Sequence, residues 1–151
     1  MDQTKTFFSK MYSIKIFTAG KIKETWLSTA LEEYEKRLKP HCKIQWVVTR
    51  TDKELLELLS KESSFVCLDS QGKQLNSTSF SKSLFTLLEK EKSRLNFVIG
   101  GFEGIDPEIS KKSIFKFSLS LLTFTSQMTR VIFLEQIYRA FQIALNTKYH
   151  R

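Results

Sequence analysis

The chain has 151 residues, of which 41% are hydrophobic and 26% are charged. This length and composition suit one globular domain with a buried core, and they exclude a long disordered or low-complexity protein. Lysine and arginine number 24 against 16 aspartate and glutamate residues, which gives a net charge of +8. Such an excess favours an anionic partner such as nucleic acid, although a solvated basic surface also explains it.

The sequence carries no membrane, metal or export signal. No apolar run approaches the roughly 20 residues that a membrane-spanning helix needs, so we expect no membrane partner. Cys42 and Cys67 each lie in an apolar, strand-like run. Two isolated cysteines of this kind predict free, buried thiols rather than a disulfide or a metal site. We interpret residues 1–11 as a short extension that is not a signal peptide, and we assign residues 12–151 to a single domain. We therefore expect a cytoplasmic protein.

The first half of the chain alternates between predicted strands and helices. Tyr12–Thr18 alternates apolar and polar residues, as a half-buried strand does, and residues 23–38 repeat apolar residues at helical spacing. Cys42–Val48 is predicted as the next strand, and Asp52 as the cap of a short leucine-rich helix.

The second half continues this alternation. Phe65–Leu68 is apolar throughout, which predicts an interior strand of a parallel sheet that ends at the turn sequence Asp69–Gly72. The elements that follow are a helix from Ser77 or Ser79, a strand over Leu95–Ile99, a short helix from Pro107 and a strand over residues 114–119. The pattern predicts an α/β fold, with a mostly parallel sheet flanked by helices.

Three glycines follow the Leu95–Ile99 strand in the turn Ile99-Gly100-Gly101-Phe102-Glu103-Gly104. Glycines at the end of a buried strand let the backbone turn sharply and let another group approach closely. Ligands of open parallel sheets bind beyond the carboxyl ends of the strands. The glycine turn is therefore either a ligand-binding loop or only a tight connection, and its spacing does not decide between them.

The C-terminal part has two unusual features. Residues 118–126 are apolar and rich in hydroxyl groups, which predicts a loop held by side-chain hydrogen bonds, with a strand extension as the alternative. The final helix, from about residue 127 to 146, is apolar on nearly every side, so it is buried on more than one side. In so small a chain we expect one of those sides to be a subunit interface, which predicts a homodimer.

Four segments together resemble one known family. They are the glycine turn, Leu119-Ser120-Leu121-Leu122-Thr123-Phe124, the helix pattern from Arg130 through Glu135-Gln136-Ile137-Tyr138-Arg139, and the terminal Tyr149-His150-Arg151. In this order they resemble the RlmH-type SPOUT methyltransferases, which methylate a pseudouridine in large-subunit ribosomal RNA. The resemblance covers about Tyr12 to Arg151.

The resemblance implies a SPOUT-type α/β fold with a deep C-terminal trefoil knot, which neither composition nor periodicity indicates. It implies S-adenosylmethionine as the methyl donor and no metal. It also implies a homodimer in which the partner's C-terminal residues lie near the methyl group. The implied reaction is methylation at N3 of a pseudouridine in 23S rRNA of the assembled ribosome.

The resemblance also implies a set of cofactor-binding residues. They are Leu68, Gly100, Gly101, Leu119, Ser120, Leu121, Leu122, Thr123 and Phe124. The local pattern agrees, because these positions follow three predicted strands whose ends would form one crevice. Leu68, Leu121 and Leu122 are candidates to sandwich the adenine ring, with a plain core role as the alternative for each.

Three residues are candidates for catalysis: His150 for proton handling, Tyr149 for stacking on the base, and Arg139 for binding phosphate or the pseudouridine carbonyls. Each has a plain alternative. These are an exposed terminal histidine, a tyrosine that anchors the tail, and an arginine paired with Glu135 one helical turn earlier. Arg130 lies nine residues before Arg139 and faces another side of the helix, so in a dimer we expect one of the two arginines to face its own cofactor and the other the partner's RNA.

One departure from the family pattern affects the function. Members usually carry Pro-His before the position of Gln127, where this chain has Thr125-Ser126. If that histidine shapes the active site, Ser126 has to replace it, so a non-catalytic ribosome- or RNA-binding module on the same scaffold remains the alternative. A nucleotide-binding protein unrelated to methylation is disfavoured, because the chain lacks both a phosphate-binding loop motif and a dinucleotide fingerprint.

Overall fold

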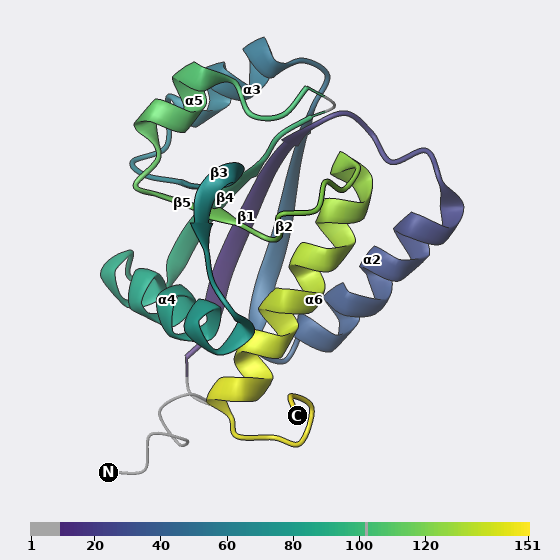
Figure 1. The fold of residues 1–151 in the computed structure, drawn as a ribbon, viewed down its shortest axis with the longest axis vertical. Helices are drawn as coiled ribbons and strands as arrows, with labels where there is room; N and C mark the ends of the chain where they lie inside the picture. The colour runs from purple at the N-terminus through teal and green to yellow at the C-terminus, as the bar shows by residue number, and fades with distance from the viewer. Residues whose placement is uncertain (1–9, 102) are drawn as a thin grey trace.

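The computed structural model describes residues 10–101 and 103–151, so most of the predicted N-terminal extension lies outside the described residues (Figure 1). The elements in chain order are β1 (Tyr12–Ala19), α2 (Thr25–Leu38), β2 (Cys42–Thr49), α3 (Asp52–Leu59), β3 (Val66–Gln74), α4 (Ser77–Lys90), β4 (Arg94–Ile99), α5 (Pro107–Lys112), β5 (Phe115–Ser118) and α6 (Ser126–Ala144). The sheet has the order β2-β1-β4-β3-β5, and every neighbouring pair is parallel. The predicted parallel sheet flanked by helices is confirmed.

The helices form two layers because side chains alternate between the two faces of each strand. Ile14 and Ile16 of β1 belong to the larger core cluster, which includes residues of α2, α4 and α6. Phe17 and Val98 point to the other face, where they pack with residues of α3 and α5. Figure 1 shows α2, α4 and α6 together on one face of the sheet.

Helix α6 lies between α2 and α4 and packs against both (Figure 1). Phe133, Leu134 and Ile137 are fully buried, and the Phe133 ring meets the Phe97 ring of β4 edge-on at 4.8 Å between centroids. The sheet and two helices therefore cover this apolar helix within one chain. Its composition alone no longer requires a subunit interface, and the homodimer stays a prediction.

Strand β3 does not end where the sequence predicts. The segment Asp69–Gly72 was expected to be a turn, but the strand continues to Gln74. An irregularity between Leu68 and Lys73 lets both residues pair with Phe117 of β5. A Cβ atom at Gly72 would lie 2.6 Å from the backbone nitrogen of Phe117, so the close approach of the two strands requires glycine there.

Two absences concern the described residues only. None of the helices in residues 10–101 and 103–151 is long and apolar enough to cross a membrane. Within the same ranges, no group of three or more His, Cys, Asp or Glu residues is placed to hold a metal ion.

Cys42 and Cys67 are free and buried, as the sequence predicts. Burial raises the pKa of the Cys42 thiol to about 12 and that of Cys67 to about 11.

Because the thiolate is the reactive form, we expect neither thiol to react with Ellman's reagent at about pH 8 in the native protein, and both to react after denaturation. Rapid labelling of the native protein would contradict this burial.

Candidate functional site

The carboxyl ends of β4 and β5 lie on either side of Leu68 in β3. Leu68 of β3 pairs with Ile99 of β4 on one side and with Phe117 of β5 on the other. The glycine turn follows Ile99, and the segment from Leu119 follows β5. The structure therefore brings the three predicted cofactor-binding segments together, as expected for a ligand site in a parallel sheet.

The two glycines of the turn have different roles. A Cβ atom at Gly100 would lie 2.6 Å from the carbonyl oxygen of Gly104, so the turn closes only because position 100 lacks a side chain. Gly101 accepts a hydrogen bond from the Gly104 N–H at 3.1 Å. A Cβ atom at Gly101 would make an ordinary contact, 3.8 Å from the Cβ of Ala19. The fold therefore requires glycine at position 100 but not at position 101.

The segment Leu119–Phe124 is a loop, and β5 ends before it at Ser118. The Ser118 hydroxyl donates to the Ser120 carbonyl at 3.0 Å, and the Leu122 N–H donates to the Ser120 hydroxyl at 2.9 Å. These bonds confirm the predicted loop held by hydroxyl groups and exclude the strand extension. The sequence showed this through its hydroxyl density.

Two leucines of this loop are unusually exposed. Leu121 is 88% exposed and Leu122 is 73% exposed, whereas Leu68 is buried. An open hollow of about 440 Å³ lies beside the loop, lined by Gln74, Leu75, Asn76, Leu119, Ser120 and Leu121. Leu121 and Leu122 are thus not core residues. Together with the loop backbone they offer an apolar ligand both surface and hydrogen-bonding groups.

Thr125 and Ser126, which depart from the family pattern, begin helix α6. The Thr125 hydroxyl accepts a hydrogen bond from the Met128 N–H at 3.2 Å, and Ser126 is the first helical residue. Threonine at this position satisfies one of the unpaired N–H groups at the helix start. In this chain the departure therefore has a clear structural role.

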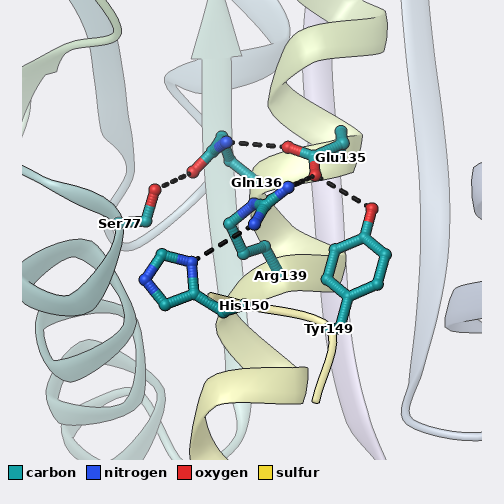
Figure 2. A network of polar contacts seen from close by, with 6 residues as sticks. All are labelled: Ser77, Glu135, Gln136, Arg139, Tyr149 and His150. Atoms are coloured by element: carbon teal, nitrogen blue, oxygen red, sulfur yellow. Dashed lines mark hydrogen bonds and ion pairs between the residues drawn. The ribbon is translucent and has the colours of Figure 1, made fainter. Parts of the chain in front are cut away.

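The three predicted catalytic residues lie together at the other end of α6 (Figure 2). Arg139 Nη1 lies 3.2 Å from His150 Nδ1, and the Arg139 guanidinium lies over the Tyr149 ring, 4.8 Å from its centroid. The rings of Tyr149 and Tyr138 also pack nearly perpendicular to each other, with 4.9 Å between centroids. Because Arg139 covers one face of the Tyr149 ring, that face is not available to stack on a base.

Glu135 holds this group together. Its Oε1 atom accepts hydrogen bonds from Arg139 Nε at 3.0 Å, from Arg139 Nη2 at 2.6 Å and from the Tyr149 hydroxyl at 3.0 Å. Burial, and then the bond to Glu135, raise the pKa of Tyr149 to about 12. The bond to Glu135 also raises the pKa of Arg139. The spacing of Glu135 and Arg139 predicts their pairing, but no local pattern indicates that Tyr149 shares the same oxygen.

Arg130 does not face a ligand surface, and the expectation for it is wrong. It is 2% exposed, and its Nη2 donates to the carbonyls of Ala19 at 3.2 Å and Gly20 at 2.6 Å. Burial lowers its pKa. Arg130 therefore ties α6 to the loop after β1, next to the position where Gly101 meets Ala19.

Comparison with protein families gives one match along nearly the whole chain. The family model described as predicted SPOUT methyltransferase matches residues 12–150. The chain belongs to the SPOUT methyltransferase family. Among its relatives, ribosomal RNA large subunit methyltransferase H of Protochlamydia amoebophila is 45% identical over 141 residues, which cover 93% of this chain and 100% of the relative. The protein of the same name from Acetivibrio thermocellus is 36% identical over 157 residues, which cover 91% of this chain and 99% of the relative.

Solved structures show the same SPOUT fold. A probable methylase family protein from Haemophilus influenzae Rd KW20 aligns with a TM-score of 0.58 at 12% identity, covering 91% of this chain and 70% of that chain. TrmJ from Z. mobilis ZM4 aligns with a TM-score of 0.52 at 5% identity, covering 87% of this chain and 70% of that chain. At such low identity these structures support the fold alone.

The two glycines of this SPOUT methyltransferase give a matched test. We expect Gly100→Ala to lower the free energy of unfolding by about 1–3 kcal/mol, because the added methyl group overlaps the Gly104 backbone. Gly101→Ala should change it by less than about 1 kcal/mol, since its Cβ has room. Urea denaturation measures both values. Equal destabilisation by the two variants would contradict the assignment of Gly100 as the residue that closes the turn.

Proposed function

We propose that this SPOUT methyltransferase transfers a methyl group from S-adenosylmethionine to N3 of a pseudouridine in 23S rRNA, within the assembled ribosome. The observation that carries the proposal is the meeting of Leu68, the glycine turn and the exposed loop leucines at one edge of the sheet. The relatives named ribosomal RNA large subunit methyltransferase H support the substrate class.

The residues at the strand ends fit the cofactor. The adenine ring needs an apolar surface, which Leu121 and Leu122 expose, and hydrogen-bonding partners, which the backbone of residues 119–124 provides. The closed turn at Gly100 sets the course of the chain after β4, beside the segment that follows β5. S-adenosylmethionine supplies an electrophilic methyl group when bound, so these residues need only hold and orient it.

Arg139 is the candidate for binding the reacting base. Among the described residues, Arg139 Nε and Nη2 bond Glu135 and Nη1 approaches His150, which leaves one N–H on Nη1 and one on Nη2 for another acceptor. Pseudouridine has a carbonyl on each side of N3. A guanidinium hydrogen bond to one of them stabilises the negative charge that develops when N3 loses its proton.

His150 and Tyr149 are assigned supporting roles in the same site. The His150 ring is exposed, so it can reach a base bound beside Arg139, and we propose that it handles the N3 proton. Tyr149 is anchored by Glu135 and covered by Arg139 on one face, and we assign it to stacking on the base through the face opposite Arg139.

A homodimer is part of the proposal. Ser126 and Arg139 lie about 20 Å apart along α6, at a rise of about 1.5 Å per residue. The proposed cofactor loop leads into Ser126, whereas Arg139 lies beside the C-terminal tail. A second copy that brings its own tail to this loop would place the candidate catalytic residues beside the cofactor. Sedimentation at micromolar concentration tests for this dimer. The C-terminal trefoil knot is part of the same proposal, and membership of the SPOUT methyltransferase family is what supports it.

Calorimetry with S-adenosylmethionine tests the cofactor site. We expect the double variant Leu121→Ser, Leu122→Ser to weaken binding at least about tenfold, because it removes apolar surface worth more than about 1.4 kcal/mol. Both side chains are exposed, so the fold should persist. Ile114→Ser is the control, because Ile114 is 47% exposed but precedes β5 rather than following it. If the unaltered protein does not bind S-adenosylmethionine at millimolar concentration, the proposal that it is a methyltransferase using this cofactor is refuted.

Methyl incorporation into ribosomes distinguishes the enzyme from the non-catalytic binding module. The substrate should be ribosomes isolated from a strain that lacks this methylation, with labelled S-adenosylmethionine as donor. We expect incorporation into 23S rRNA at a single pseudouridine, and at least about a hundredfold less with Arg139→Met, since the variant loses a group that positions the base. Ribosome binding without incorporation would support the binding module instead.

A further inference from the structure

The two carboxylate oxygens of Glu135 have separate partners (Figure 2). Oε1 accepts all the bonds from Arg139 and Tyr149, whereas Oε2 accepts a hydrogen bond from Gln136 Nε2 at 2.7 Å. Adjacent residues on a helix do not normally face each other. The bond between Glu135 and Gln136 therefore requires something that turns the Gln136 amide toward its neighbour.

Ser77 supplies that orientation. Its hydroxyl donates to Gln136 Oε1 at 2.8 Å, which leaves the amide nitrogen to donate to Glu135. Ser77 is the first residue of α4, and Asn76 before it both caps the helix and lines the hollow beside the cofactor loop. A chain of hydrogen bonds thus runs from Ser77, the residue after Asn76, through Gln136 and Glu135 to Tyr149 in the C-terminal tail.

The bond from Gln136 sets which carboxylate oxygen faces Arg139. Arginine commonly pairs with a carboxylate through two parallel bonds, one to each oxygen. Here Oε2 points to Gln136, and Arg139 directs both Nε and Nη2 to Oε1. In this orientation Nη1 reaches His150, and the Tyr149 hydroxyl also reaches Oε1.

We propose that Gln136, oriented by Ser77, is a positioning residue for the C-terminal tail: it holds Glu135 so that Arg139, Tyr149 and His150 keep their arrangement. Without the amide, the Glu135 carboxylate loses the bond that holds Oε2 toward Gln136 and is free to rotate. Rotation moves Oε1 away from the Tyr149 hydroxyl and lets the guanidinium take the two-oxygen pairing, in which its contact with His150 is lost. The catalytic consequence rests on the proposed function, but the arrangement of the tail does not.

The test compares four variants. Gln136→Met keeps a side chain of similar length without the amide, and Ser77→Ala removes the hydroxyl that orients it. Ser77→Thr retains a hydroxyl and should restore the arrangement. Thr78→Ala is the matched control, because Thr78 is the exposed neighbour of Ser77 on the same helix turn.

The first measurement is the ionisation of Tyr149, followed by phenolate absorbance and isolated as the difference from Tyr149→Phe. In the unaltered protein the pKa of Tyr149 is raised to about 12, by burial first and then by its bond to the Glu135 carboxylate. That bond favours the neutral phenol, so its loss lowers the pKa toward the ordinary 10.0. At about pH 11, with the fold verified by circular dichroism, we expect Tyr149 to be mostly unionised in the unaltered protein, Ser77→Thr and Thr78→Ala. A larger ionised fraction at the same pH is expected in Gln136→Met and Ser77→Ala, because the contribution of the bond is lost while that of burial remains.

The second measurement is methyl transfer to ribosomes. We expect kcat to fall about tenfold in Gln136→Met and Ser77→Ala, a typical result of misplaced catalytic groups, while the dissociation constant of S-adenosylmethionine changes less than about twofold. An unchanged Tyr149 titration in both variants overturns the positioning role, whether or not the protein methylates. Absence of methyl transfer by the unaltered protein refutes the proposed function, and the titration still decides the role of Gln136.

Discussion

The pairing of β3 between β4 and β5 is the constraint on which the proposed cofactor site depends. It sets Leu68 beside both Ile99 and Phe117, so the segments that follow β4 and β5 leave the sheet next to each other. Two glycines permit this crowding. Gly72 allows β3 to continue against β5, and Gly100 allows the turn after β4 to close on itself. A side chain at either position would meet backbone, which cannot move aside as a flexible side chain can.

Helix α6 connects the two halves of the proposed site. Its first residues continue the Leu119–Phe124 loop, where Thr125 supplies the cap, and its last turns carry the Glu135 and Arg139 pair. Packing between α2 and α4 fixes the helix, and Arg130 joins its start to the loop after β1. Because the helix is rigid and buried, the loop and the tail are held at a constant separation within one protomer. A homodimer would bring the tail of one copy to the loop of the other.

The polar group at the C-terminus shows how a small protein can order a short tail. Glu135 and Arg139 have exposed fractions of only 17% and 25% for their side chains, so their bonds are less screened by water than those of a surface pair. Tyr149 adds an apolar ring over the guanidinium and a hydroxyl on the same carboxylate. The last residues are thereby fixed by side-chain contacts, without a strand or helix of their own.

The sequence by itself determined the α/β class, the order of strands and helices, the buried thiols and the hydroxyl-rich loop, because each follows from local periodicity or local hydrogen bonding. The glycines after Leu95–Ile99 predicted a tight turn by a local rule, whereas the candidate cofactor-binding residues came from the resemblance to a family and stay a prediction. Tertiary structure decided what depends on residues far apart in the chain. The continuation of β3 through Asp69–Gly72 depends on β5, the burial of Arg130 depends on the carbonyls after β1, and the role of Gln136 depends on Ser77, 59 residues away. No local pattern carries these contacts, because each exists only when separate elements pack together.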